Sequence, residues 1–183
     1  MPLKTFVKVG SITNLSDARY CAGMGADLLG FNTIEGKDNY LSPKQFQEIR
    51  GWVTGPKVVA EVSGVQSGSQ LASIVENYQP DFLELGLAEL PFLSGNTIPF
   101  ILRIDAKIPV GNLIQQPDFV LASSFVEGIN YPLLIEVTSL AEAEQAFQHS
   151  SIKGIALRGS AEISPGLKNY DELAEVLEFL DVD

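Results

Sequence analysis

Eight short apolar segments recur along the chain, and most of them are separated by segments with a helical pattern of apolar residues. They are Phe6–Val9, Leu28–Phe31, Lys57–Val62, Phe82–Leu85, Pro99–Ile104, Phe119–Leu121, Leu133–Val137 and Ile155–Leu157. Such an alternation is typical of repeated strand–helix units around a parallel sheet. Eight units fit a closed barrel better than an open sheet with helices on both faces. We therefore predict an α/β fold, a (β/α)8 TIM-type barrel.

The predicted helices differ in length, and those in the middle of the chain are short. The other helices have recognisable starts or apolar faces. Asn14 can cap the first, Ser42 with Pro43 opens the second, and Leu71, Ile74, Val75 and Tyr78 form the apolar face of the third. Ser139 with Glu142 is a capping box, in which each residue's side chain bonds the other's backbone N–H, and Asn169 as cap with Glu172 repeats it for the last helix. The fourth, fifth and sixth, near 88–93, 110–115 and 125–130, cover two turns at most, so we expect shortened helices or loops there. The chain of 183 residues is shorter than the roughly 200 of a small barrel, and these reduced helices account for the difference. We predict one truncated barrel domain over residues 1–183.

The net charge and the low numbers of cysteine and histidine exclude several kinds of partner and site. The net charge of −11 argues against nucleic acid and against an anionic membrane surface. One cysteine, Cys21, excludes an intrachain disulfide, and we expect it to be buried in a helix; one histidine, His149, is too few for a histidine metal site. We expect no metal and no cofactor. The start of the chain does not have the pattern of a signal peptide, and no apolar run reaches the roughly 18 residues of a membrane span, so we expect a cytoplasmic protein.

Charged residues near the ends of the predicted strands are the most unusual feature of the sequence. They are Lys8, Glu61, Glu84, Arg103, Glu136 and Arg158. Charges at such positions avoid the apolar helix-facing side, so we expect three cations and three carboxylates to face one another in the upper barrel, with Asp105, Ser63 and Ser123 as further candidates. One interpretation is a self-neutralising network that plugs the barrel. The other is a remodelled site in which Lys8 or Arg158 holds an anion and a glutamate acts as base.

Both ends of the chain carry motifs of a known family. The start has Lys8-Val9-Gly10-Ser11-Ile12-Thr13 followed by Asp17-Ala18, and then Gly25-Ala26-Asp27-Leu28-Leu29-Gly30-Phe31. The end has Gly159-Ser160-x-Glu162 and Ser164-Pro165-Gly166-x-Lys168. These segments resemble phosphoribosylanthranilate isomerase, a (β/α)8 barrel of tryptophan biosynthesis.

The resemblance implies an Amadori rearrangement in which a cysteine acts as base and an aspartic acid as acid. The cysteine position is occupied by Gly10, and the aspartate position falls near Ser123 or Ala122. The position of the family's substrate-binding arginine is occupied by Asn39. Arg158-Gly159-Ser160 resembles part of the family's phosphate site, where a short helical turn at Ala161-Glu162 would present N–H groups to an anion. The alternative is that Gly159 only makes the turn and that Arg158 forms a salt bridge. Candidate ligand-binding residues are therefore Lys8, Arg158, Gly159 and Ser160.

Three functions follow from these observations. The first is an isomerase-like barrel without the family's activity that binds a small anionic or phosphorylated ligand. The alternative is an active isomerase, on phosphoribosylanthranilate or a related sugar phosphate, that uses substitute carboxylates at the barrel mouth. The third is a homodimer formed through an apolar patch beside the reduced helices, made of Leu87, Leu90, Phe92, Leu93 and Phe125.

Overall fold

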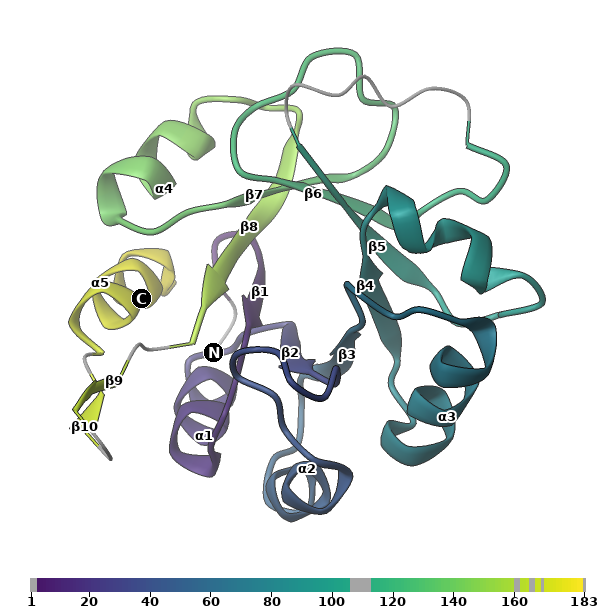
Figure 1. Cartoon of the computed structure of the whole chain (residues 1–183). Coiled ribbons are helices and arrows are strands. Elements are labelled where there is room, and N and C mark those ends of the chain that lie inside the picture. The colour runs from purple at the N-terminus through teal and green to yellow at the C-terminus, as the bar shows by residue number, and fades with distance from the viewer. Residues whose placement is uncertain (1–2, 106–112, 160–161, 165–166, 169, 183) are drawn as a thin grey trace.

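The computed structural model describes residues 3–105, 113–159, 162–164, 167–168 and 170–182. Eight parallel strands among these residues form a closed barrel (Figure 1). The strands are β1 (Phe6–Gly10), β2 (Leu28–Asn32), β3 (Lys57–Glu61), β4 (Phe82–Leu85), β5 (Phe100–Ile104), β6 (Phe119–Ala122), β7 (Leu133–Glu136) and β8 (Ile152–Arg158). The barrel closes where β8 pairs with β1, from Gly154 opposite Phe6 to Arg158 opposite Gly10. All eight predicted strands are confirmed.

The helices around the barrel are incomplete, as the sequence predicts. Among the described residues they are α1 (Leu15–Gly23), α2 (Pro43–Arg50), α3 (Gly68–Tyr78), α4 (Leu140–Phe147), α5 (Asp171–Leu180) and the 3₁₀ helix η1 (Leu87–Leu93). The structure contains no helix within residues 113–118 or 123–132, and residues 106–112 of the β5–β6 connection lie outside the described residues. No helix of the described residues is long and apolar enough to cross a membrane.

The helix starts confirm some capping predictions and correct others. Asn14 and Ser42 cap α1 and α2 as predicted. Ser139 caps α4, but the Glu142 carboxylate accepts hydrogen bonds from the N–H and hydroxyl of Thr138, so the predicted reciprocal bond to Ser139 is replaced. The residue before α5 is Tyr170, which makes no side-chain cap. The predicted cap Asn169 lies outside the described residues.

A short hairpin replaces a predicted helical turn after β8. Strand β9 (Glu162–Ser164) pairs antiparallel with β10 (Leu167–Lys168), beside α5 in Figure 1. Glu162 therefore begins a strand, and the expectation of a helical turn at this residue is wrong. Ala161 lies outside the described residues.

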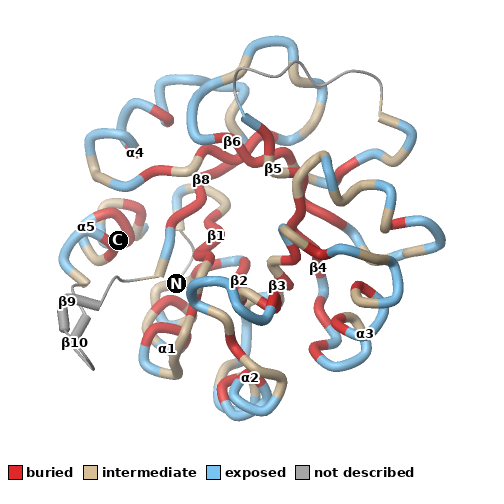
Figure 2. Tube along the Cα trace, in the orientation of Figure 1, coloured by how far each residue is buried: buried red, intermediate tan, exposed pale blue. Residues whose placement is uncertain are grey.

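Alternation along the strands builds two apolar cores. The strands and parts of the helices that contribute to them are buried, as the red segments of Figure 2 show. Side chains that point outward pack against the helices, and this outer core includes the fully buried thiol of Cys21, as predicted. Side chains that point inward form a smaller core inside the barrel, made of Leu28, Val59, Phe82, Ile101, Leu121, Leu134 and Ala156. Phe6 stacks on Phe119 at 4.9 Å between ring centroids next to this inner core. The inner core fills the barrel beneath its mouth.

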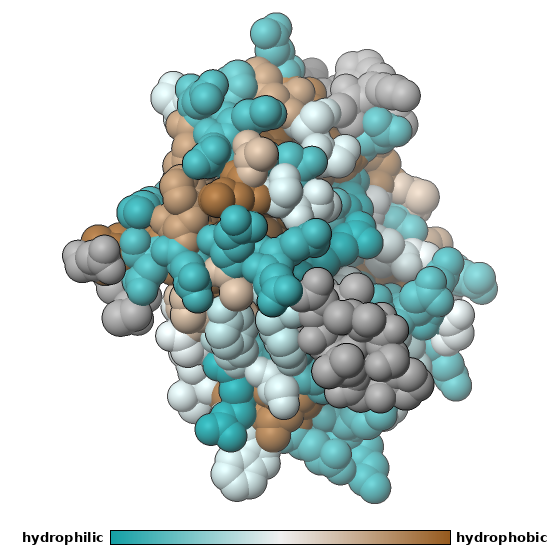
Figure 3. All heavy atoms as spheres, turned by 90° about the vertical axis from the view of Figure 1, so that its left-hand side faces the viewer, coloured by the Kyte–Doolittle hydropathy of each residue, from teal (hydrophilic) through white to brown (hydrophobic). Residues whose placement is uncertain are grey.

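The residues of the predicted apolar patch differ in exposure: Phe125 is 37% exposed, and the other four are buried or partly buried. Leu93 is 1% exposed, and Leu87, Leu90 and Phe92 pack partly buried against the outer core. Phe125 stacks on His149 at 4.4 Å between ring centroids. Over the face with α4 and α5, hydrophilic residues are interspersed with hydrophobic ones (Figure 3). A homodimer through this patch remains a prediction.

Candidate functional site

Six strands bring a charged side chain to the same level of the barrel interior. Each charged residue follows an interior apolar residue by two positions, as Glu61 follows Val59 and Glu84 follows Phe82. Because side chains two apart on a strand point to the same side, the charges lie one layer above the inner core. The six residues are Lys8 of β1, Glu61 of β3, Glu84 of β4, Arg103 of β5, Glu136 of β7 and Arg158 of β8.

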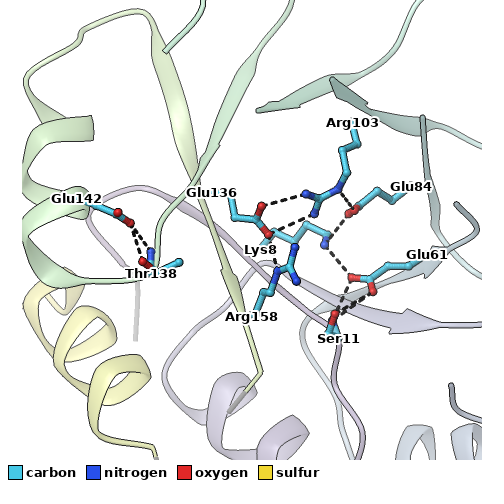
Figure 4. Close-up of polar contacts among 9 residues, drawn as sticks. All are labelled: Lys8, Ser11, Glu61, Glu84, Arg103, Glu136, Thr138, Glu142 and Arg158. Carbon is cyan, nitrogen blue, oxygen red and sulfur yellow. Dashed lines mark hydrogen bonds and ion pairs between the residues drawn. The ribbon is translucent and has the colours of Figure 1, made fainter. Parts of the chain in front are cut away.

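These residues form one continuous chain of ion pairs with alternating charge (Figure 4). Lys8 Nζ lies 3.0 Å from Glu61 Oε1 and 2.6 Å from Glu84 Oε2. The latter oxygen has no hydrogen-bond partner of normal geometry among the described residues, so its pairing with Lys8 is electrostatic. Arg103 Nε is 3.1 Å from Glu84 Oε1 and continues the chain toward β7.

The far end of the chain is centred on Glu136. Arg103 donates two hydrogen bonds to its carboxylate, NH1 to Oε2 at 2.9 Å and NH2 to Oε1 at 3.3 Å. Arg158 Nε donates to Glu136 Oε1 at 2.8 Å. Bidentate arginine–carboxylate geometry of this kind is among the stronger protein ion pairs.

The pairs fix the charge states of the mouth. Burial by itself lowers the pKa of the Lys8 ammonium, but Glu84 and Glu61 outweigh it and raise the pKa above its ordinary value. Burial raises the pKa of Glu84, but Lys8 and Arg103 outweigh it and lower the pKa. In the same way the two arginines outweigh burial and lower the pKa of Glu136 to about 2. The Glu84 and Glu136 carboxylates and the Lys8 ammonium are therefore charged at neutral pH.

Two glycines make room for the Glu61 carboxylate. A Cβ atom added to Gly10 would overlap Glu61 Oε1 and lie 2.7 Å from Lys8 Nζ. A Cβ added to Gly30 would overlap the same carboxylate oxygen. Ser11 adopts a left-handed conformation with φ 55°, and its N–H donates to Glu61 Oε1 at 3.1 Å. The sequence marks Gly10, but nothing in it points to the contributions of Gly30 and Ser11, which depend on where Glu61 lies.

A cavity of about 210 Å³ opens at the mouth and is lined by all six charged residues together with Gly10, Ser11, Asn32, Ser63, Ala156 and Leu157. The Lys8 and Glu84 side chains are 2% and 4% exposed, whereas the Arg158 side chain is 65% exposed. Of the further candidates, Ser63 lines this cavity. Ser123 instead lines a second cavity, between β6, β7 and α4, and Asp105 lies exposed just after β5. The mouth therefore contains both a network of paired charges and a cavity that the same residues line.

The segment after β8 that the sequence predicts to bind an anion is Arg158-Gly159-Ser160. The N–H of Gly159 donates to the carbonyl of Gly10 at 2.7 Å, so it is not available to an anion. Ser160 lies outside the described residues. Arg158 remains the exposed cation at this edge of the cavity.

Comparison with solved structures identifies the fold. Crystal structures of phosphoribosylanthranilate isomerase match this chain over nearly its full length. One, in complex with reduced 1-(o-carboxyphenylamino)-1-deoxyribulose 5-phosphate, has a TM-score of 0.74 and 18% identity, covering 95% of this chain and 97% of that one. TrpF from Jonesia denitrificans has a TM-score of 0.77 and 13% identity, with 95% of each chain covered. The isomerase from Thermococcus kodakaraensis has a TM-score of 0.70 and 12% identity, covering 98% of this chain and 100% of that one.

These values establish a shared fold. No protein-family model and no curated protein matches the sequence. The similarity therefore confirms the predicted barrel and its likeness to phosphoribosylanthranilate isomerase structures. It leaves activity and ligand to be argued from the residues at the mouth.

Proposed function

We propose that this protein is a barrel of the phosphoribosylanthranilate isomerase type that binds a small anionic ligand at its mouth and does not catalyse the Amadori rearrangement. The observation that carries this proposal is the continuous chain of ion pairs from Glu61 to Arg158. A general acid or base works best when its pKa lies near the working pH. The pKa values of Lys8, Glu84 and Glu136 are all shifted away from neutrality, which disfavours proton transfer by any of them.

The surroundings of Gly10 support the same conclusion. The resemblance aligns this residue with the family's cysteine base, and Glu61 and Lys8 occupy the space that a side chain at this position would need. Gly10 therefore offers no side chain that could replace the family's base, and Glu61 and Lys8 leave no room for one.

Cavity size and exposure support binding of a small anion. A cavity of about 210 Å³ is below the roughly 300–1,000 Å³ of common ligand pockets, which favours a ligand smaller than a phosphoribosyl anthranilate. Arg158 lines it and contacts other described residues only through Nε, so its two terminal nitrogens are free to receive an anion.

Two measurements test the proposal. Purified protein is incubated with phosphoribosylanthranilate beside an active isomerase, and we expect no turnover above background. Inorganic phosphate and acetate are titrated into labelled protein by NMR, and we expect saturable shifts around the mouth that disappear in Arg158→Gln. Turnover at the rate of the active enzyme would contradict the loss of activity and favour the alternative with substitute carboxylates. Absence of saturable shifts would contradict anion binding.

A further inference from the structure

The ion-pair chain has two ends of opposite charge, and both ends line the same cavity. Arg158 ends the chain on β8, and Glu61 ends it on β3. We propose that the ligand of this cavity is a small zwitterion, of the size of a free α-amino acid, whose carboxylate binds Arg158 and whose ammonium binds Glu61. This inference rests on the proposed function, because it specifies the ligand of the same site.

The Arg158 end fits a carboxylate. Its Nε is engaged by Glu136 at 2.8 Å, and its contacts with other described residues end there. NH1 and NH2 therefore keep their donors for a ligand, and the side chain is 65% exposed. The planar guanidinium group matches the two oxygens of a carboxylate.

The Glu61 end fits an ammonium group. Its Oε1 accepts from Lys8 Nζ at 3.0 Å and from the N–H of Ser11 at 3.1 Å. Among the described residues, its Oε2 accepts hydrogen bonds only from Ser11, with the N–H at 3.3 Å and the hydroxyl at 3.4 Å, which are long contacts. A carboxylate oxygen has lone pairs for more than one donor, so Oε2 has capacity for an ammonium hydrogen.

The wall between these two ends leaves space for a short molecule. Strands β1 and β2 lie between β8 and β3 in the barrel. At the mouth the cavity lining on this side consists of Lys8, whose ammonium group is paired with Glu61 and Glu84, and of the small residues Gly10, Ser11 and Asn32. Figure 4 shows the Arg158 and Glu61 side chains on either side of Lys8. A cavity of about 210 Å³ accommodates an amino acid more readily than a larger metabolite.

Charge balance also favours a zwitterion over a simple anion. The three cations and three carboxylates of the mouth neutralise one another. A simple anion such as acetate can pair with Arg158, but it brings no partner for Glu61 at the other end of the network. A zwitterion brings a partner for each end and no net charge.

Matched small molecules test this inference on the unaltered protein. Glycine and alanine carry both charges, acetate and propionate carry only the carboxylate, and methylamine carries only the ammonium. Binding is followed by NMR titration at neutral pH. Because a charged hydrogen bond is lost with either group, we expect the amino acids to bind about tenfold to a hundredfold more tightly than the single-charge compounds.

Two variants locate the two contacts. Arg158→Gln is expected to abolish the advantage of glycine over methylamine, and Glu61→Gln its advantage over acetate. Thermal unfolding checks that each variant remains folded. Because Arg158 is more exposed than Glu61, its replacement should disturb the fold less. If acetate binds as tightly as glycine, the zwitterion is refuted while the proposed anion binding survives. If methylamine equals glycine, or if no compound of this series binds, the zwitterion is refuted, and the proposed anion binding fails as well only if inorganic phosphate also gives no saturable shifts.

Discussion

Replacing Lys8 by methionine should destabilise the protein strongly, because this lysine pairs with the buried Glu84 carboxylate and with the partly buried Glu61 carboxylate. Its side chain is 2% exposed and lies 3.0 Å from Glu61 and 2.6 Å from Glu84. Without it, Glu84 keeps only Arg103 as an ion-pair partner among the described residues. Breaking a buried ion pair on one side costs about 3–5 kcal/mol. For a chain of 183 residues, at about 2–4 °C per kcal/mol, the melting temperature should fall by about 6–20 °C.

The matched control is Arg158→Met at the exposed end of the same network. Its side chain is 65% exposed, and Glu136 retains Arg103, so we expect a loss of about 1 kcal/mol or less. Both variants are compared by calorimetry and by urea unfolding. The double variant Lys8→Met with Glu84→Gln should recover part of the loss, because it removes the uncompensated buried charge. A Lys8→Met protein as stable as Arg158→Met would refute the argument that buried pairing holds the mouth together.

Further predictions concern space, pH and reactivity. Gly10→Cys should lower the free energy of unfolding by about 1–3 kcal/mol, because the new side chain overpacks against Glu61, and it should not create isomerase activity. The control Gly23→Ala has open space around it and should leave the urea unfolding curve nearly unchanged. Because folding lowers the pKa of Glu136 from 4.5 to about 2, its contribution to stability is complete above pH 4.5 and is lost as the pH falls toward 2. Urea unfolding over this range should show a shallower decrease for Glu136→Gln, and equal slopes would contradict the assigned pairing. Burial raises the pKa of the Cys21 thiol to about 12, so a thiol reagent should label the protein only on unfolding, and fast labelling of the folded protein would contradict its burial.

The barrel could be predicted because its strands leave a direct signature in the sequence. Each apolar run is buried on both sides, by helices or loops outside and by the inner core inside. The layer of charged residues at the mouth was also predictable from the strands. Glu61 and Glu84, for example, stand two positions beyond interior apolar residues and therefore point to the same side. The caps of α1 and α2 are local, and they are confirmed.

The partners within the site could not be predicted, because they depend on closure of the barrel. Lys8 on β1 reaches β3 and β4, strands that lie far from it in the sequence. The need for Gly30 follows only from the position of the Glu61 carboxylate. The hairpin of β9 and β10 arises from a pairing between two very short segments that carry little apolar pattern.

The central claim is that the carboxylates of the mouth are held in one charge state, and the most direct measurement is their titration. Carbon-13 NMR of glutamate side chains, assigned with Glu84→Gln and Glu136→Gln, reports the ionisation of each group in the folded protein. We expect both carboxyls to stay ionised at every pH above about 5, because paired cations lower their pKa values. Titration of either group near neutral pH would contradict this claim, because that carboxyl could then act as a general acid or base.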